Sequence, residues 1–312
     1  MTRVRPTISV ITPSLNSGRT IERAIESVLV QDYEGVQHIV CDGGSSDQTR
    51  DILSQYPHLS VYCGPDQSSH HAANAGLTRA TGEWIGFICA DDWYEPGAFD
   101  VVADILHANP MVDMLCGVAA FHGGGSPSFH RQHRRGAFLV EELTLGVPAF
   151  NSYFFRRNLL LRLGGFRTQF NYAADRDLLL RGIQKATCHV SDRHIYNYLR
   201  HPGSRTMNGN METKRKVRVE HLAIAADLSR DRAAPLILRR GLARWLAFET
   251  GQLAQIELRQ GRVLATLRHL IANIAHLRLL VPAIAIKLRM QAEDRRRYVT
   301  VIENSFDRCE SI

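Results

Sequence analysis

The strongest constraint on the fold is an alternation of short apolar runs with helical segments through the first third of the chain. Each run is rich in β-branched and apolar residues and has the length of one buried strand. Between the runs, apolar residues recur at helical spacing. Short connections between strands and helices are typical of βαβ units, so an α/β fold with a mostly parallel sheet flanked by helices is predicted. The apolar runs cover residues 7–12, 36–41, 59–63 and 84–89.

Turn residues, most of them polar, follow each of the four predicted strands. In chain order they are Pro13, Asn16, Asp42, Asp66, Asp91 and Asp92. In a parallel sheet the loops after the strands meet at one edge, where α/β proteins bind ligands, so these residues predict a nucleotide site. Adjacent carboxylates repel each other unless a cation or a donor group lies between them, which makes Asp91 and Asp92 candidate ligands for a hard cation carrying phosphates. The alternative is a solvated turn, because aspartate is common where strands end.

Composition and motifs exclude several classes of protein. The 312 residues are 45% hydrophobic and 22% charged, which is ordinary for a soluble globular protein. Neither the glycine-rich loop of dinucleotide enzymes nor that of P-loop NTPases occurs. No signal peptide is recognised. The longest uncharged apolar stretch near the C-terminus, residues 279–286, is shorter than the roughly 20 residues that a membrane span needs. The expected location is cytoplasmic, and the inner face of the membrane is the alternative.

A set of degenerate segments occurs in a specific order and spacing. The segments are VITPSLN at 10–16, VCDGGSSDQT at 40–49, ANAGL at 73–77, ATGE at 80–83 and ADDWY at 90–94. Together they resemble the nucleotide-binding half of a family 2 glycosyltransferase with the GT-A fold. Members of this family transfer a sugar from a nucleotide-sugar donor to an acceptor hydroxyl and invert the anomeric centre. The resemblance implies a UDP-linked donor, Mn²⁺ or Mg²⁺ as cofactor, and a glycan or lipid-linked acceptor.

The resemblance also implies roles for the acids. Asp42 matches the acid that accepts a hydrogen bond from the donor's base, and a turn aspartate bonded to the neighbouring backbone is compatible with that role. Asp92 matches the metal-binding acid of the DxD-type motif, whose first position is here Ala90. Asp91 then faces the ribose or lies just outside the metal's ligands. Asn74 is assigned to the nucleotide-binding residues.

Two histidine segments are expected near the diphosphate. His71 stands where many relatives have aspartate, and it either contacts a donor phosphate or is a half-exposed histidine at a helix start. Residues 196–205 (YNYLRHPGSR) resemble the family's His-x-Gly-Ser segment, which closes over the diphosphate. The resemblance implies a metal contact for His201 and phosphate contacts for Ser204 and Arg205, since arginine donors form a fork that suits a diphosphate. The alternative is an ordinary surface turn.

Residues 172–181 (YAADRDLLLR) predict a helix with Asp175 and Asp177 in its first turn. Acids at a helix start are stabilised by about 0.3–1 kcal/mol, which explains one of them without a catalytic role. The resemblance implies that Asp175 is the general base and that Asp177 anchors the helix behind it. A neutral alcohol is a poor nucleophile, so the reaction requires a carboxylate within hydrogen-bond reach of the attacking hydroxyl.

The basic charge belongs to the C-terminal third. Residues 215–312 carry a net charge of +8, against −1 for residues 1–214. The resemblance fades here, so a catalytic domain over 1–214 and a basic amphipathic helical extension over 215–312 are predicted. The extension packs on the catalytic domain, pairs with another subunit, or makes a peripheral contact with an anionic membrane. Helix breaks are expected near Pro235, Gly241, Gly261 and Pro282.

Two other kinds of function share features with this sequence. A sugar-nucleotide pyrophosphorylase shares a similar sheet, but its glycine-rich basic loop is missing after the first predicted strand. A nucleic-acid-binding or scaffolding protein would act through the basic C-terminal helices. Those helices lack the interleaved aromatic residues on which bases stack, so no nucleic-acid partner is expected.

Overall fold

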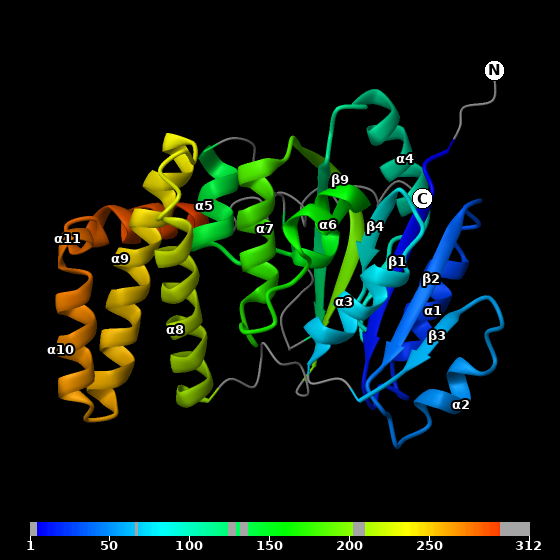
Figure 1. Ribbon diagram of the computed structural model, residues 1–312, viewed down its shortest axis with the longest axis horizontal. Coiled ribbons are helices and arrows are strands. Elements are labelled where there is room, and N and C mark those ends of the chain that lie inside the picture. The colour runs from blue at the N-terminus through cyan, green and yellow to red at the C-terminus, as the bar shows by residue number, and fades with distance from the viewer. Residues whose placement is uncertain (1–4, 66–67, 124–128, 132–136, 202–209, 294–312) are drawn as a thin grey trace, which may run out of the picture. The chain divides into compact units, whose positions relative to one another are not determined.

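A computed structural model describes residues 5–65, 68–123, 129–131, 137–201 and 210–293. Backbone contacts divide the chain into two compact units (Figure 1). The first unit comprises residues 1–128 and 149–202, and the second comprises residues 129–148 and 203–312. The domain boundary expected after residue 214 stays a prediction.

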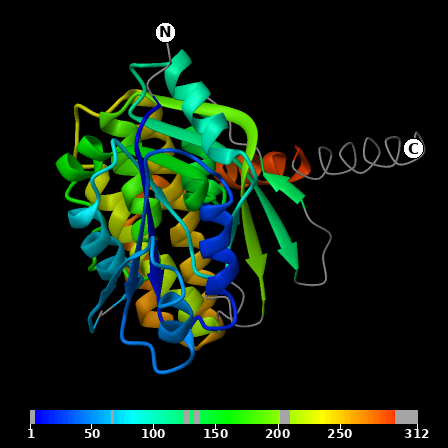
Figure 2. The same ribbon diagram turned by 90° about the vertical axis from the view of Figure 1, so that its right-hand side faces the viewer.

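The first unit is built on one mixed sheet with the strand order β3-β2-β1-β4-β8-β6-β9-β5. Strands β3, β2, β1 and β4 are parallel, as the alternation predicts. Strand β8 is antiparallel to both β4 and β6, β6 and β9 run parallel side by side (Figure 2), and β5 is antiparallel to β9. The strands are β1 (Ile8–Ser14), β2 (Val36–Asp42), β3 (Ser60–Cys63), β4 (Trp84–Phe87), β5 (Trp93–Tyr94), β6 (Met114–Gly123), β8 (Tyr153–Arg156) and β9 (Cys188–Arg200).

Side chains of β1 alternate between two helical layers, because successive strand residues point to opposite faces of a sheet. Ile8 and Val10 are buried in a core shared with α1 and α4. Ile11 faces α3, where a Cβ added at Gly76 would lie 2.5 Å from the Ile11 Cγ2 atom. Glycine at this position therefore lets α3 approach the sheet. The helices are α1 (Ile21–Leu29), α2 (Thr49–Leu53), α3 (Ser69–Arg79), α4 (Ala98–Ala108), α6 (Arg157–Leu163), α7 (Ala174–Lys185) and the 3₁₀ helix η1 (Phe150–Ser152).

The second unit is helical and is organised around α9, against which its other helices pack. The break expected at Gly241 is wrong, because α9 continues through it. A Cβ at Gly241 would lie 2.3 Å from the Val140 Cγ1 atom, so this glycine allows close approach of α5. The break expected near Pro282 is confirmed, because residues 278–279 form a turn and a helix begins at residue 280, with Pro282 in its first turn, where a backbone N–H is not needed. The elements are β7 (Phe129–Arg131), α5 (Ala137–Leu145), α8 (Met211–Leu228), α9 (Leu236–Arg259), α10 (Val263–Ala272) and α11 (Ile274–Leu277).

A buried carboxylate joins α8 to α9. Glu249 is 2% exposed and accepts hydrogen bonds from Arg218 at 2.8 Å and from the Trp245 indole at 3.0 Å. The His221 Nδ1 atom lies 3.0 Å from the same carboxylate. The charge is therefore paired inside the helical unit. Within the described ranges, none of the helices combines the length and the apolar character needed to cross a membrane.

The core of the sheet contains a histidine that should make stability depend on pH. His38 is buried, and its Nε2 atom lies 2.8 Å from the Thr12 hydroxyl. Burial, with a smaller contribution from His58, lowers the pKa of His38 from 6.5 to about 3. Below pH 6.5 the unfolded chain takes up a proton that the folded chain does not bind. The part of the free energy of unfolding that depends on neutral His38 is thus fully present above pH 6.5. Between pH 6.5 and pH 3 it decreases by about 1.4 kcal/mol per pH unit.

Urea unfolding at a series of pH values from about 8 to 5 measures this effect. The His38→Gln variant is expected to show a shallower loss of stability with falling pH than the unmodified chain, whatever its stability at pH 8. Equal slopes for the two proteins would contradict a buried neutral His38.

Candidate active site

The loops after β1 and β2 are tied together at the carboxyl edge of the sheet, as the sequence predicts. Asn16 has a φ of +51°, in the left-handed region that asparagine tolerates. Its N–H donates to the Ser45 hydroxyl at 2.8 Å, and its side-chain oxygen accepts from the Ser46 N–H at 2.9 Å. Pro13 pairs with Cys41 near the ends of the two strands.

Asp42 is fully buried at the end of β2. It accepts hydrogen bonds from the Ser45 N–H at 3.0 Å, from the Ser45 hydroxyl, and from the Arg50 Nε atom at 3.1 Å. Burial alone would raise the pKa of Asp42, but the hydrogen bonds from Ser45 and Arg50 outweigh it and hold the pKa below its usual value. These three hydrogen bonds tie the end of β2 to the loop after it and to α2, and the Asp42 side chain has no exposed surface. Its contact with a nucleobase stays a prediction.

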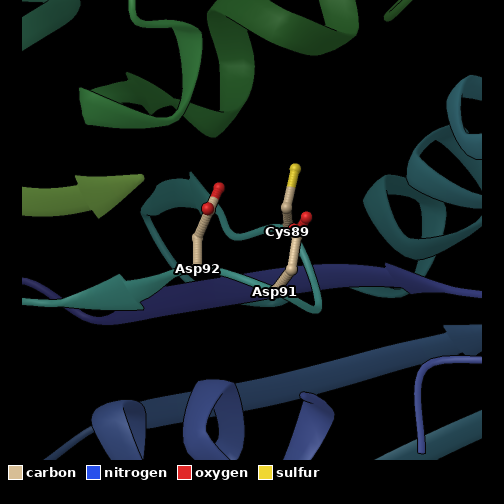
Figure 3. Close-up of side chains that lie close together, drawn as sticks. All are labelled: Cys89, Asp91 and Asp92. Carbon is tan, nitrogen blue, oxygen red and sulfur yellow. The ribbon is translucent and has the colours of Figure 1, made fainter. Parts of the chain in front are cut away.

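Three donor side chains gather after β4. Cys89, Asp91 and Asp92 each offer a ligand atom, and these atoms all lie within 4.8 Å of one another (Figure 3). Strand β4 ends at Phe87, earlier than the apolar run 84–89 predicts, so Cys89 belongs to the site loop and not to the strand. Ala90 lies in the core that α1 forms with β2.

Asp92 is turned into the protein and is 2% exposed. One carboxylate oxygen accepts from the Leu199 N–H at 2.9 Å, and the other accepts from the Tyr196 hydroxyl at 2.9 Å. The Tyr196 oxygen also accepts from the Cys89 N–H at 3.2 Å. Burial, followed by repulsion from Asp91, raises the pKa of Asp92 to about 8. Asp92 therefore ties the loop after β4 to β9.

Asp91 is more open, with 31% of its side chain exposed. Its Oδ2 atom lies 2.9 Å from the Nε2 atom of His201, at the end of β9. Arg23 donates to the Asp91 carbonyl at 2.6 Å and stacks over the Trp93 ring at 3.9 Å, which fixes the loop backbone. The structure thus brings together Asp91 and His201, which are far apart in the sequence.

Asp177 anchors the start of α7. It is fully buried and accepts from the Arg167 Nε atom at 2.9 Å and from the Arg181 Nε atom at 2.8 Å. Asp175 lies two residues earlier, on the opposite side of the first turn, and remains partly exposed. Desolvation, followed by the charges of Asp92 and Asp91 and to a smaller extent of Asp175, raises the pKa of the Cys89 thiol, although Cys89 has exposed surface on the site loop.

Asn74 and His71 make contacts inside the protein. Both ends of the Asn74 amide bind the Phe166 backbone, with two hydrogen bonds of 2.9 Å. Gly165 has a φ of +66°, and a Cβ there would lie 2.4 Å from the Asn74 oxygen, so this turn requires glycine. The His71 Nδ1 atom lies 2.9 Å from the Ser68 hydroxyl, which also accepts from the His71 N–H. Contacts of Asn74 and His71 with the donor stay predictions. Asp66, Ser204 and Arg205 lie outside the described residues.

The sequence patterns do not indicate Tyr196, Asn151 and Tyr198, which also belong to the site. Tyr196 supports Asp92, and the side-chain amide of Asn151 donates to the Cys89 sulfur at 3.1 Å. The Asn151 N–H in turn donates to the Tyr198 hydroxyl at 3.0 Å. These contacts depend on β5, directly after the site loop, pairing with β9, and on η1 leading into β8 beside β4, and no local pattern encodes either arrangement.

Comparison with known proteins identifies the family of the chain. Residues 9–181, more than half of its length, match the family described as Glycosyl transferase family 2. The chain belongs to this family. It is 30% identical over 181 residues to an uncharacterized glycosyltransferase of Mycobacterium tuberculosis, covering 56% of this chain and 68% of that protein. It is 31% identical over 132 residues to the putative teichuronic acid biosynthesis glycosyltransferase TuaG of Bacillus subtilis, covering 41% and 52%.

Solved structures share the fold of this family 2 glycosyltransferase. TarS 1-349 of S. aureus superposes with a TM-score of 0.65 at 17% identity and covers 96% of this chain and 91% of that one. The mannosyltransferase PcManGT from Pyrobaculum calidifontis, in complex with GDP-Man and Mn²⁺, gives a TM-score of 0.57 at 20% identity and covers 97% and 88%. The predicted GT-A-like fold with C-terminal helices is confirmed.

Proposed function

We propose that this glycosyltransferase moves a hexosyl or N-acetylhexosaminyl group from a UDP-linked donor to an acceptor hydroxyl, with inversion of the anomeric centre. The observation that carries the proposal is that Asp91 and Asp92, on the loop after β4, lie close together and that His201, at the end of β9, contacts Asp91. TarS of S. aureus was solved with UDP-GlcNAc, and PcManGT with GDP-Man and Mn²⁺, which supports a nucleotide-sugar donor and a metal.

The donor atoms around Asp91 fit a divalent cation, Mn²⁺ or Mg²⁺. Asp91 offers a partly exposed carboxylate, and His201 offers a ring nitrogen 2.9 Å away from it. Both oxygens of Asp92 already accept hydrogen bonds from the protein. We therefore assign direct coordination to Asp91 and His201, and the alternative keeps the metal on Asp92. When bound, the cation neutralises charge that develops on the leaving diphosphate.

The base that we propose is Asp175. The two arginines on Asp177 hold the first turn of α7 in place and leave the Asp175 carboxylate partly exposed. From there Asp175 takes the proton of the acceptor hydroxyl as that oxygen attacks the sugar from the side opposite the diphosphate. A single displacement of this kind inverts the anomeric centre.

A panel of nucleotide sugars tests the function. A ligand that binds the folded chain at 100 times its Kd stabilises it by about 2.7 kcal/mol. With Mn²⁺ present, a UDP-sugar is expected to raise the melting temperature more than the GDP- or dTDP-sugars. A nucleic-acid binder would instead be stabilised by an oligonucleotide, and that effect would weaken as salt increases. If the oligonucleotide alone stabilises the protein, the proposal fails.

The acceptor that we propose is a lipid-linked or polysaccharide-precursor glycan at an anionic membrane surface. Residues 258–292 contain six lysines and arginines but no aspartate or glutamate. The same stretch exposes large apolar side chains. Exposed apolar groups among cations suit an anionic bilayer, whereas two such faces would repel each other in a dimer. Because anionic lipids face the cytoplasm, the inner leaflet is the expected surface. The exposed residues are Leu258, Val263, Leu264, Leu267, Ile271, Ile274, Val281, Ile284 and Leu288.

Vesicle co-sedimentation of the full chain tests this surface. Binding to vesicles of anionic phosphatidylglycerol is expected to exceed binding to neutral phosphatidylcholine, and to fall in the double variant Leu264→Ser, Ile271→Ser. Met111→Ser is the matched control, because Met111 is 81% exposed but lies on the first unit. Equal sedimentation of the double variant and the control would remove the membrane from the proposal.

A further inference from the structure

The loop after β4 places a thiol beside its two carboxylates. Cys89 and Asp91 project on the same side of the loop as Asp92 (Figure 3), and Ala90 between them is turned into the core. The Cys89 sulfur accepts a hydrogen bond of 3.1 Å from the Asn151 amide, so its lone pairs take part in the site. The sulfur lies within 4.8 Å of ligand atoms of both acids.

The three side chains differ in how open they are to a cation. Asp92 is 2% exposed, and its two oxygens already accept hydrogen bonds from Tyr196 and Leu199. The remaining donors are the Cys89 sulfur and the Asp91 carboxylate, with the His201 imidazole 2.9 Å from Asp91. Thiolate, imidazole and carboxylate form the donor set of borderline cations such as Zn²⁺ and Co²⁺, whereas Mg²⁺ prefers oxygen ligands.

We infer that Cys89 is a direct ligand of the cation together with Asp91, and that its sulfur makes the site prefer Zn²⁺ or Co²⁺ over Mg²⁺. The inference rests on the proposed function, because it concerns the cation that holds the donor diphosphate. On binding, the Cys89 S–H bond breaks, a metal–sulfur bond forms, and the proton passes to solvent.

The consequence for specificity is that one side chain sets the choice of metal. A carboxylate at position 89 would give the cation a second hard oxygen ligand and would favour Mg²⁺. Serine would leave a neutral hydroxyl, which is a weak ligand for any of these ions. Loss of even an outer partner of a metal ligand typically costs about 10–100-fold in affinity, so loss of the sulfur itself should cost at least about tenfold.

Titration of the full chain with Co²⁺, without nucleotide, tests the inference by absorption spectroscopy. A thiolate bound to Co²⁺ gives a charge-transfer band in the near ultraviolet. The band is expected in the unmodified chain and in Cys63→Ser, an exposed cysteine on β3 that serves as the control. It is expected to be lost in Cys89→Ser, with Co²⁺ affinity at least about tenfold lower. Cys89→Asp should bind without the band and should shift the preference toward Mg²⁺.

The outcomes separate this inference from the proposed function. A band that persists in Cys89→Ser overturns the inference. So does the absence of a band in the unmodified chain when a UDP-sugar with Mn²⁺ still stabilises the protein, and in that case the proposed function stands. If the band is present and depends on Cys89 but no nucleotide sugar stabilises the protein, the sulfur ligand stands and the proposed function fails.

Discussion

Asp91→Asn is expected to abolish the stabilisation by a UDP-sugar with Mn²⁺ and to lower turnover by about 10²–10³-fold, the usual effect of losing one group that stabilises developing charge. Asp91 is the partly exposed carboxylate beside His201, and asparagine cannot supply its charge. Thermal shift across a Mn²⁺ titration, together with turnover at saturating Mn²⁺, measures both effects.

Asp92→Asn is the matched comparison. Asp92 is buried, both of its oxygens bind the protein, and its pKa is raised to about 8, so it is largely protonated near neutral pH without metal. An amide is close to that state in size and charge. We therefore expect Asp92→Asn to keep a Mn²⁺-dependent shift that Asp91→Asn loses. The reverse pattern would return the metal to Asp92, as the motif predicts.

Asp175→Asn is expected to lower sugar transfer by about 10²–10⁴-fold while donor binding stays unchanged, because it removes the base and leaves the nucleotide contacts. Measured turnover and the UDP-sugar thermal shift separate the two effects. Asp192→Asn, which changes an exposed carboxylate on β9, is the control and is expected to keep normal turnover. Normal turnover in Asp175→Asn would exclude Asp175 as the base.

The neighbouring acid should behave differently. Asp177 is buried between Arg167 and Arg181, and removing one partner of a buried ion pair typically costs about 3–5 kcal/mol. Asp177→Asn is therefore expected to lower the melting temperature, whereas Asp175→Asn is not. The pair of variants distinguishes loss of chemistry from loss of the helix start that presents it.

Much of the fold was predictable from local patterns. The alternation of strands and helices and the meeting of the loops after β1 and β2 follow from periodicity and turn residues. Helix ends and breaks were less predictable. Gly241 reads as a breaker in the sequence, but in the structure it lets α5 pack closely on α9.

The candidate site was predictable in its location and in part of its membership. A strand that ends in two acids marks the site whatever the rest of the chain does, because the carboxyl ends of parallel strands share one edge. Which acid is open to a ligand was not readable, because adjacent residues in a loop have no fixed period that assigns them to a face. Cys89 was also not recognised as a site residue, because the apolar run 84–89 predicts that it belongs to the strand.

The sequence by itself determined the order of the elements, the edge of the sheet where the site forms, and the family. These depend on residues close together in the chain, whose spacing sets local structure. Tertiary structure decided that Asp92 is buried under Tyr196 and Leu199 and that Asp91 lies beside His201. It did so because β5, directly after the site loop, pairs with β9, which lies about a hundred residues later in the chain, and no local pattern encodes that pairing.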